Sequence, residues 1–171
     1  LSTVNCSVAG VYASSTSPGP SNYYYNTFYV GGTQPSGAYS SWAFVRTNTG
    51  AVSFRNNIFV NARTGGAGNQ YVIGNEAGAP LSGWLSSSSN YNVFIGTNAN
   101  TIGEWGLGNA QSLDQWVASS GGDKQSWSTI TSVINPSNLF AGISTGDLSI
   151  VSGNAEAWIV SGKGIALTGQ N

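Results

Sequence analysis

The chain has 171 residues, of which only 6% are charged, and its formal net charge is −1. With no basic run, it lacks the phosphate-neutralising patch that nucleic-acid binding uses. No apolar stretch approaches the ~20 residues that span a bilayer, so membrane insertion is not expected.

Length and composition predict a single folded domain over residues 1–171. Six tryptophans and a hydrophobic fraction of 40% supply enough apolar surface for one core. Turn formers and strand formers dominate, while good helix formers are scarce. Because the sequence contains no Met, Leu1 is not a translation start, and we expect a processed product or a fragment of a longer secreted protein. The single cysteine, Cys6, excludes an internal disulfide framework.

Strand-like runs alternate along the chain with turn segments rich in Gly, Ser, Asn and Pro. The expected strands are Val4–Ala13, Tyr23–Val30, Trp42–Arg46, Ala51–Asn61, Tyr71–Ile73, Tyr91–Ile95, Asp147–Ile150 and Ala157–Val160. One segment differs, because residues 112–119 have the pattern of a short helix. Ser112 can cap its N-terminus, Asp114 favours its first turn, and Gly121 ends it. Its Trp116 is expected in the core, as is Trp158.

The motif Asn-x-Phe, in which x is any residue, occurs four times, at intervals of 31, 35 and 46 residues. Residues two apart in a strand face the same side, so each Asn and Phe would face inward together. Repetition at this interval predicts a solenoid whose Phe rings stack and whose Asn side chains bond between coils where the chain turns. The predicted stack is Asn26 and Phe28, Asn57 and Phe59, Asn92 and Phe94, and Asn138 and Phe140.

The chain resembles the right-handed parallel β-helix segments of large secreted and cell-surface proteins of Bacteroidetes-type bacteria. The matching segments are 54–61, 64–71, 89–94, 112–116 with Gly122-Asp123 and Ser126, then Asn135-Pro136, Leu139-Phe140 and 146–150. The resemblance covers roughly residues 50–168. It implies an all-β, right-handed parallel β-helix with long loop insertions and one short helix near 112–119. Gln70 stands where His is common in such segments, and the stop at Gln170-Asn171 suggests an uncapped end.

β-Helices often host lyases and hydrolases, so a polysaccharide-degrading enzyme is one alternative. Hydrolysis needs two carboxylates across one bond, and lyase chemistry needs a base near a metal or an arginine clamp. The six acids are Glu76, Glu104, Asp114, Asp123, Asp147 and Glu156, none adjacent to another. Coil stacking could still align Glu76 with Glu104, whereas Asp123 and Asp147 look like turn residues. Without any His, no catalytic residue, metal site or cofactor is predicted.

Glycan binding is a second alternative, because aromatic faces among Asn, Gln, Ser and Thr suit sugar rings. The candidate contacts are Trp42, Trp84 and Trp105, each flanked by glycine or serine. Trp84 lies in the stretch Leu81-Ser82-Gly83-Trp84-Leu85. For each of these three tryptophans, packing over an edge of the solenoid is the competing interpretation.

A structural role is the third alternative. A solenoid with open ends exposes unpaired strands that can stack on a neighbouring domain or an identical copy. Low charge weakens the repulsion that keeps proteins apart. We therefore expect an extracellular structural or adhesive module of a bacterial surface protein or filament, with weak recognition of a surface glycan.

Overall fold

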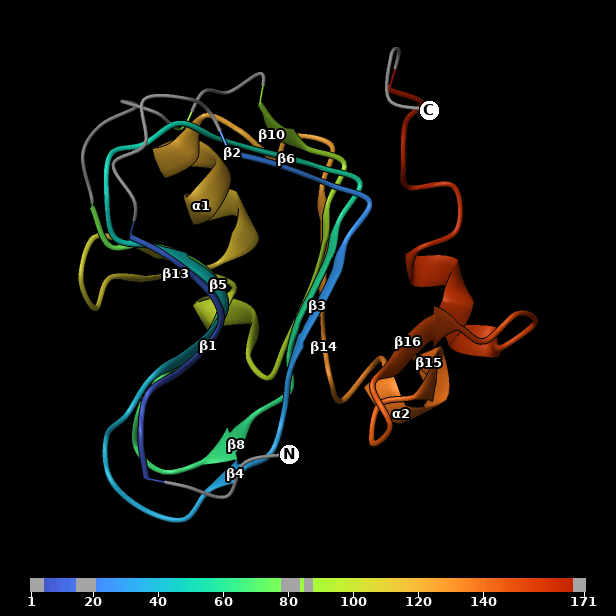
Figure 1. The fold of residues 1–171 in the computed structure, drawn as a ribbon, viewed down its shortest axis with the longest axis horizontal. Coiled ribbons are helices and arrows are strands. Elements are labelled where there is room, and N and C mark those ends of the chain that lie inside the picture. Colours follow the sequence, from blue (N-terminus) through green and yellow to red (C-terminus); the bar gives the residue numbers. More distant parts are fainter. Residues whose placement is uncertain (1–4, 15–20, 78–83, 85–87, 168–171) are drawn as a thin grey trace.

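The computed structural model describes residues 5–14, 21–77, 84 and 88–167. It is a β-solenoid of about three turns, built from stacked parallel sheets (Figure 1). The expectation of an all-β parallel β-helix is therefore confirmed. The first sheet contains β1 (Val8–Ala13), β5 (Ser41–Arg46), β9 (Gln70–Asn75), β12 (Gly103–Trp105) and β13 (Ala110–Gln111), of which β12 and β13 pair antiparallel.

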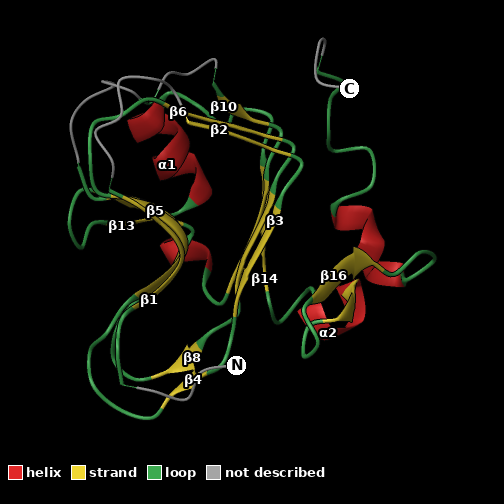
Figure 2. Cartoon of the chain, in the orientation of Figure 1, coloured by secondary structure: helices red, strands yellow, loops and turns green. Residues whose placement is uncertain are grey.

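Two further sheets close each coil. The second has the order β10 (Ser89–Asn90), β6 (Val52–Arg55), β2 (Ser21–Tyr24), and the third has the order β14 (Trp127–Ile130), β11 (Val93–Gly96), β7 (Ile58–Asn61), β3 (Thr27–Val30). The short strands β4 (Thr33–Gln34) and β8 (Thr64–Gly65) pair at another corner, and a 3-10 turn, η1, covers Ala99–Thr101. Figure 2 shows how little of the described chain is helical.

Two runs expected as single strands are each broken by a corner. Tyr23–Val30 bends between β2 and β3, where Tyr25 has φ of +57°, and Ala51–Asn61 bends between β6 and β7, where Asn56 has φ of +59°. Tyr91 repeats this left-handed conformation in the next coil. Such a conformation is uncommon for residues other than glycine. Here it turns the chain so that the asparagine that follows points inward.

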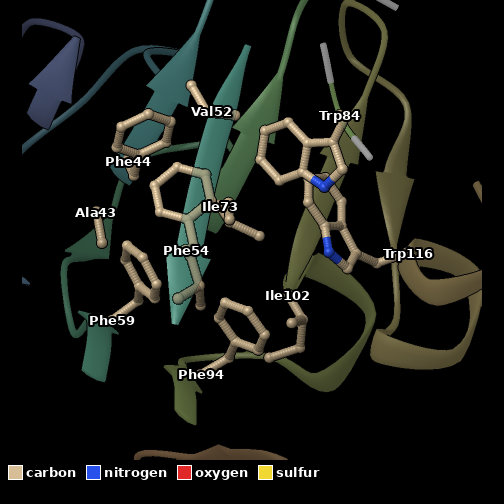
Figure 3. Close-up of a cluster of buried hydrophobic side chains, with 11 residues drawn as sticks. Ala43, Phe44, Val52, Phe54, Phe59, Ile73, Trp84, Phe94, Ile102 and Trp116 are labelled. Atoms are coloured by element: carbon tan, nitrogen blue, oxygen red, sulfur yellow. The ribbon is translucent and has the colours of Figure 1, made fainter. Parts of the chain in front are cut away.

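The interior holds a continuous cluster of buried apolar side chains. Phe44, Phe54, Phe59 and Phe94 are fully buried within it, and Figure 3 shows these rings converging from successive strands. Two indoles, Trp84 and Trp116, fill one end of the cluster and meet edge to face with centroids 5.0 Å apart.

Helix α1 (Leu113–Ser120) covers the end of the solenoid at which these indoles lie. The predicted capping is confirmed: Ser112 and Gln115 form a reciprocal capping box, and Gly121 ends the helix with φ of +70°. In Figure 1, α1 lies inside the outline of the overlapping coils. The expected uncapped end at Gln170-Asn171 falls outside the described residues, and the coil stack itself ends under α1.

The last described segment does not add a coil. It contains α2 (Pro136–Leu139), the antiparallel pair β15 (Phe140–Gly142) and β16 (Asp147–Ile150), and the 3-10 helix η2 (Ala155–Ile159). The strand expected over Ala157–Val160 is therefore wrong. This unit buries Ile134, Leu139 and Ile159 against the outer face of the third sheet, whose Val60, Val93 and Ile95 point away from the solenoid core. Trp158, expected in the core, is 52% exposed.

Candidate functional site

The corner asparagines form a ladder of hydrogen bonds along the solenoid. Asn57 Oδ1 accepts the backbone N–H of Asn26 over 3.0 Å and its Nδ2–H over 3.2 Å. Asn92 Oδ1 accepts the same two groups of Asn57 over 3.0 and 3.1 Å. Each rung therefore donates toward the following coil and accepts from the preceding one. Beside the ladder, Phe28, Phe59 and Phe94 stack with centroids 4.9 and 5.5 Å apart.

The fourth rung is not the predicted Asn138. Asn92 N donates to Ser126 Oγ over 2.9 Å, and Asn92 Nδ2 donates to Asp123 Oδ1 over 3.0 Å. Asp123, read as a turn residue, is buried and ends the ladder. Asn138 is exposed in α2 and donates to Glu156 Oε1, and Phe140 packs against Tyr29. The fourth Asn-x-Phe motif does not join the ladder, because Asn138 lies 46 residues after Asn92, beyond the last coil.

At its other end the ladder is open. No described residue donates to Asn26 Oδ1, whose own amide nitrogen donates to Tyr24 O and Asn57 Oδ1. β1, β2 and β3 are the outermost strands of their three sheets on this side. The described solenoid thus has one end closed by α1 and one end with three unpaired strand edges, the N-terminal edge.

Glu104, one of the two acids considered for catalysis, is buried in an outer cluster on the first sheet. Only 2% of its surface is exposed. Its Oε2 accepts a 2.6 Å hydrogen bond from Trp42 Nε1, and its Oε1 accepts a 2.7 Å bond from the backbone N–H of Gly108. Burial raises the pKa of Glu104, and these two hydrogen bonds oppose the rise. Trp42 also stacks on Tyr71 with centroids 6.0 Å apart.

The structure brings Glu76 and Glu104 near enough to interact. Glu76 directly follows β9, Glu104 lies in the adjacent strand β12, and the charge of Glu76 contributes to the raised pKa of Glu104. Burial also raises the pKa of Glu76. Both oxygens of Glu104 are already bonded within the protein, so this carboxyl group serves as an anchor for Trp42 and the 106–109 turn. Within the described residues, no three His, Cys, Asp or Glu side chains form a group that could hold a metal ion.

The three tryptophans predicted to contact glycans are not grouped on one face. Trp84 is 1% exposed, with the Arg46 guanidinium 5.1 Å from its ring centroid, so its prediction as a surface contact is wrong. The residues on either side of it lie outside the described ranges. Trp105 is half-buried and packs edge-on against Trp84 and Trp116. Trp42 is half-buried and held by Glu104. Trp84 and Trp116 fill one end of the core. Trp84 is therefore buried even though a glycine precedes it in the sequence.

Sequence reasoning missed an exposed aromatic at another place. Trp127, the first residue of β14, is 46% exposed, and Lys163 Nζ lies 3.7 Å from its ring centroid. The two residues come together because the segment after η2 runs back along the corner of the solenoid. No local pattern joins positions 36 residues apart, and Trp127 was not singled out.

Comparisons with known proteins add no identity to this geometry: no family model, no curated protein and no solved structure matches the chain. Among the described residues, no helix is long and apolar enough to cross a membrane.

Proposed function

We propose that the protein is a non-catalytic structural and adhesive module of a secreted or cell-surface protein, extended at its N-terminal edge by a further parallel coil. The observation that carries this proposal is the polarity of the asparagine ladder. Its open acceptor, Asn26 Oδ1, is exposed and would accept the two hydrogen bonds that an asparagine of a preceding coil would donate. α1 closes the opposite end, so another copy of the chain cannot stack there head to tail.

The apolar side chains of the first coil support the same conclusion. Val11, Tyr23 and Phe28 are only half-buried. Their register partners one coil further in are Phe44, Phe54 and Phe59, all with 0% exposure. A preceding coil would bury the first three as completely, at roughly 25 cal/mol per Å² of apolar surface removed from water. Unpaired strand edges also favour pairing with another strand.

The proposal is tested by giving the chain such a coil. Val8 and Gln70 are both partners of Ser41 in the register, so a duplicate of residues 41–69 inserted between Ser7 and Val8 continues the spacing of the coils. We expect a higher unfolding temperature and slower amide hydrogen exchange in β1, β2 and β3. The duplicated Asn57 would donate to Asn26.

The matched control is the same insertion with Asn57→Ala in the duplicate alone, which removes the amide donor and keeps the strands. It should retain only part of the gain in stability. Unchanged exchange in β1, β2 and β3 with the intact duplicate would refute the proposal. A concentration-dependent dimer of the parent chain that protects these strands would also refute it, because two N-terminal edges would then be meeting each other.

Placement outside the cell belongs to the same proposal, supported by the low charge and by the resemblance to surface β-helices. It is tested by brief trypsin treatment of intact cells that produce the parent protein. Release of peptides cut at Lys124 or Lys163 from intact cells is expected. Their appearance only after lysis would count against surface placement.

The alternative function is a polysaccharide-degrading enzyme, favoured by the effect of the Glu76 charge on the pKa of Glu104. Against it, Glu104 has both oxygens engaged in hydrogen bonds of 2.6 and 2.7 Å. Release of reducing or unsaturated ends from a polysaccharide panel, abolished by Glu76→Gln and retained by Asp114→Asn, would establish the enzyme. Equal turnover by the parent chain, Glu76→Gln and Asp114→Asn would be assigned to a contaminating enzyme.

A further inference from the structure

We propose that a groove beside Trp127 binds an anionic polysaccharide, through lysine side chains that pair with its acidic groups and aromatic rings that pack on its sugars. The groove lies between the corner of the last coil and the returning segment near Lys163. Its lining residues are Tyr91, Lys124, Gln125, Ser126, Trp127, Gly162, Lys163 and Gly164. The site deepens the adhesive part of the proposed function, but it does not depend on stacking at the N-terminal edge.

The groove brings together both lysines of the chain. The chain has only two lysines, Lys124 and Lys163, and both line this one hollow. Of the three arginines, Arg46 and Arg63 are buried and Arg55 is half-buried. A protein with a net charge of −1 thus presents its two accessible ammonium groups together, although they are 39 positions apart in sequence.

Within the described residues, no carboxylate offsets these charges. The lining contains no Asp or Glu, and neither lysine pairs with an acid among the described residues. Asp123 precedes Lys124 but is 1% exposed, and its oxygens accept hydrogen bonds from Ser89, Asn92, Trp116 and Ser126. Its carboxylate is therefore turned into the protein. The two ammonium groups remain available to an anion from solution.

Aromatic surface lies beside the charges. Lys163 Nζ is 3.7 Å from the centroid of Trp127, a cation–π contact that holds the ammonium over the ring. Trp127 nevertheless keeps 46% of its surface exposed. Gln125 and Ser126 add polar groups to the same wall. Flat apolar faces among amides, hydroxyls and cations match the mixed surface of an acidic sugar.

A second hollow lies next to the groove. It shares Tyr91, Lys163 and Gly164 with the first and adds Tyr25 and Asn56, among others. The side-chain amide of Asn56 fixes the segment that follows Gly164: Ile165 N donates to Asn56 Oδ1 over 2.8 Å, and Asn56 Nδ2 donates to Ile165 O over 2.7 Å. Two neighbouring hollows suit a chain of sugars better than a single small anion.

A nucleic acid fits this chemistry less well. Aromatic rings and cations also bind single strands, but each phosphate neutralised requires a cation along the backbone. Two lysines on a protein of net negative charge do not supply such a track. An acidic polysaccharide offers apolar sugar faces that can pack on the exposed indole beside the two lysines.

The test is native electrophoresis of the full chain through gels that contain alginate, a carboxylated polymer, heparin, a sulfated one, or neutral dextran. Retardation by one or both acidic polymers and none by dextran is expected, and the comparison separates carboxylate from sulfate recognition. Binding should weaken strongly at about 0.5 M NaCl, because salt screens exposed charges. Lys124→Gln and Trp127→Ala should each weaken the affinity about tenfold, the loss of one charge-assisted or stacking contact.

Trp158→Ala is the matched control, because Trp158 is 52% exposed and lies outside both linings. It should bind as the parent chain does. Lys124 is exposed on the surface, so Lys124→Gln preserves the fold even if Trp127→Ala disturbs it. Absence of retardation by alginate and heparin, equal retardation of all variants, equal retardation by dextran, or tighter binding to single-stranded oligo(dT) would each overturn the proposal. None of these outcomes bears on the end-stacking test.

Discussion

The indole of Trp116 donates a hydrogen bond to Asp123 Oδ2 over 3.0 Å. This contact ties α1 to the last rung of the asparagine ladder, because Asp123 Oδ1 accepts from Asn92. The same carboxylate accepts from Ser89 in β10 and from Ser126 just before β14. One buried acid thus fastens the capping helix to two sheets.

Asp123→Asn should destabilise the protein by about 2–4 kcal/mol, since an amide group would place its own donors against buried donors. Urea unfolding followed by tryptophan fluorescence measures the change. Asp114→Asn, an exposed change on α1, is the control and should stay within about 0.5 kcal/mol of the parent. A loss at position 123 no larger than at position 114 would contradict the anchoring role.

Asn57→Ala should cost about 2–4 kcal/mol, because it leaves Asn92 Oδ1 without the Nδ2 donor and Asn26 without its acceptor. Asn138→Ala provides the comparison. It removes an exposed side chain whose amide donates to Glu156, and a loss of about 1 kcal/mol or less is expected. Equal losses would show that the ladder contributes nothing beyond an ordinary surface contact.

Phe59→Ala should destabilise by about 3–5 kcal/mol, as expected for a fully buried ring whose removal leaves a cavity. Phe28→Ala removes the same ring from the half-buried first coil and should cost about 1–3 kcal/mol. The difference between the two, measured by chemical denaturation, reports how much of the stack lies inside the molecule. A larger loss at Phe28 would contradict the assignment of the first coil as the open end.

The raised pKa of Glu104 gives a pH dependence of a defined sign. A carboxyl group that holds its proton more tightly when folded favours the folded state at low pH. That contribution is present below the ordinary value of 4.5 and is lost as the pH rises through the folded pKa. The contribution of Glu104 to the free energy of unfolding should therefore fall as the pH rises above 4.5.

Glu76→Gln isolates the charge of the neighbouring acid. Removing that charge should lower the pKa of Glu104, because Glu76 contributes to its rise. The indole N–H resonance of Trp42 reports the titration directly, since it donates to Glu104. An unshifted midpoint in the variant would contradict the electrostatic coupling of the two acids, while Asp114→Asn should leave the midpoint unchanged.

The coil architecture could be predicted because inward residues repeat at an interval near one coil. Asn26, Asn57 and Asn92 lie in one ladder, as their spacing of 31 and 35 residues suggested. The same repeat wrongly predicted Asn138 as the fourth rung. Ser126 and Asp123 occupy that position and accept the hydrogen bonds of Asn92. A hydroxyl and a carboxylate can fill the place of an amide, and a pattern search for asparagine cannot find them.

Exposure of tryptophans was the least predictable property. Trp84 follows a glycine in a Gly/Ser-rich stretch yet is buried, whereas Trp127 opens a strand and remains exposed. Their surroundings are set by α1 covering the end of the coils and by the return of the segment around Lys163. Both are long-range arrangements that the residues next to each tryptophan do not encode.

Because α1 covers only one end of the coil stack, the two ends should differ in how easily they open. Each coil is stabilised only by its neighbours, so the first coil, held from one side, should open most easily. Hydrogen exchange should therefore be fastest in β1, β2 and β3 and slowest in β7, β9 and β11. Unfolding would then proceed as an unwinding toward α1, and a pulling force applied at the first coil would meet rising resistance.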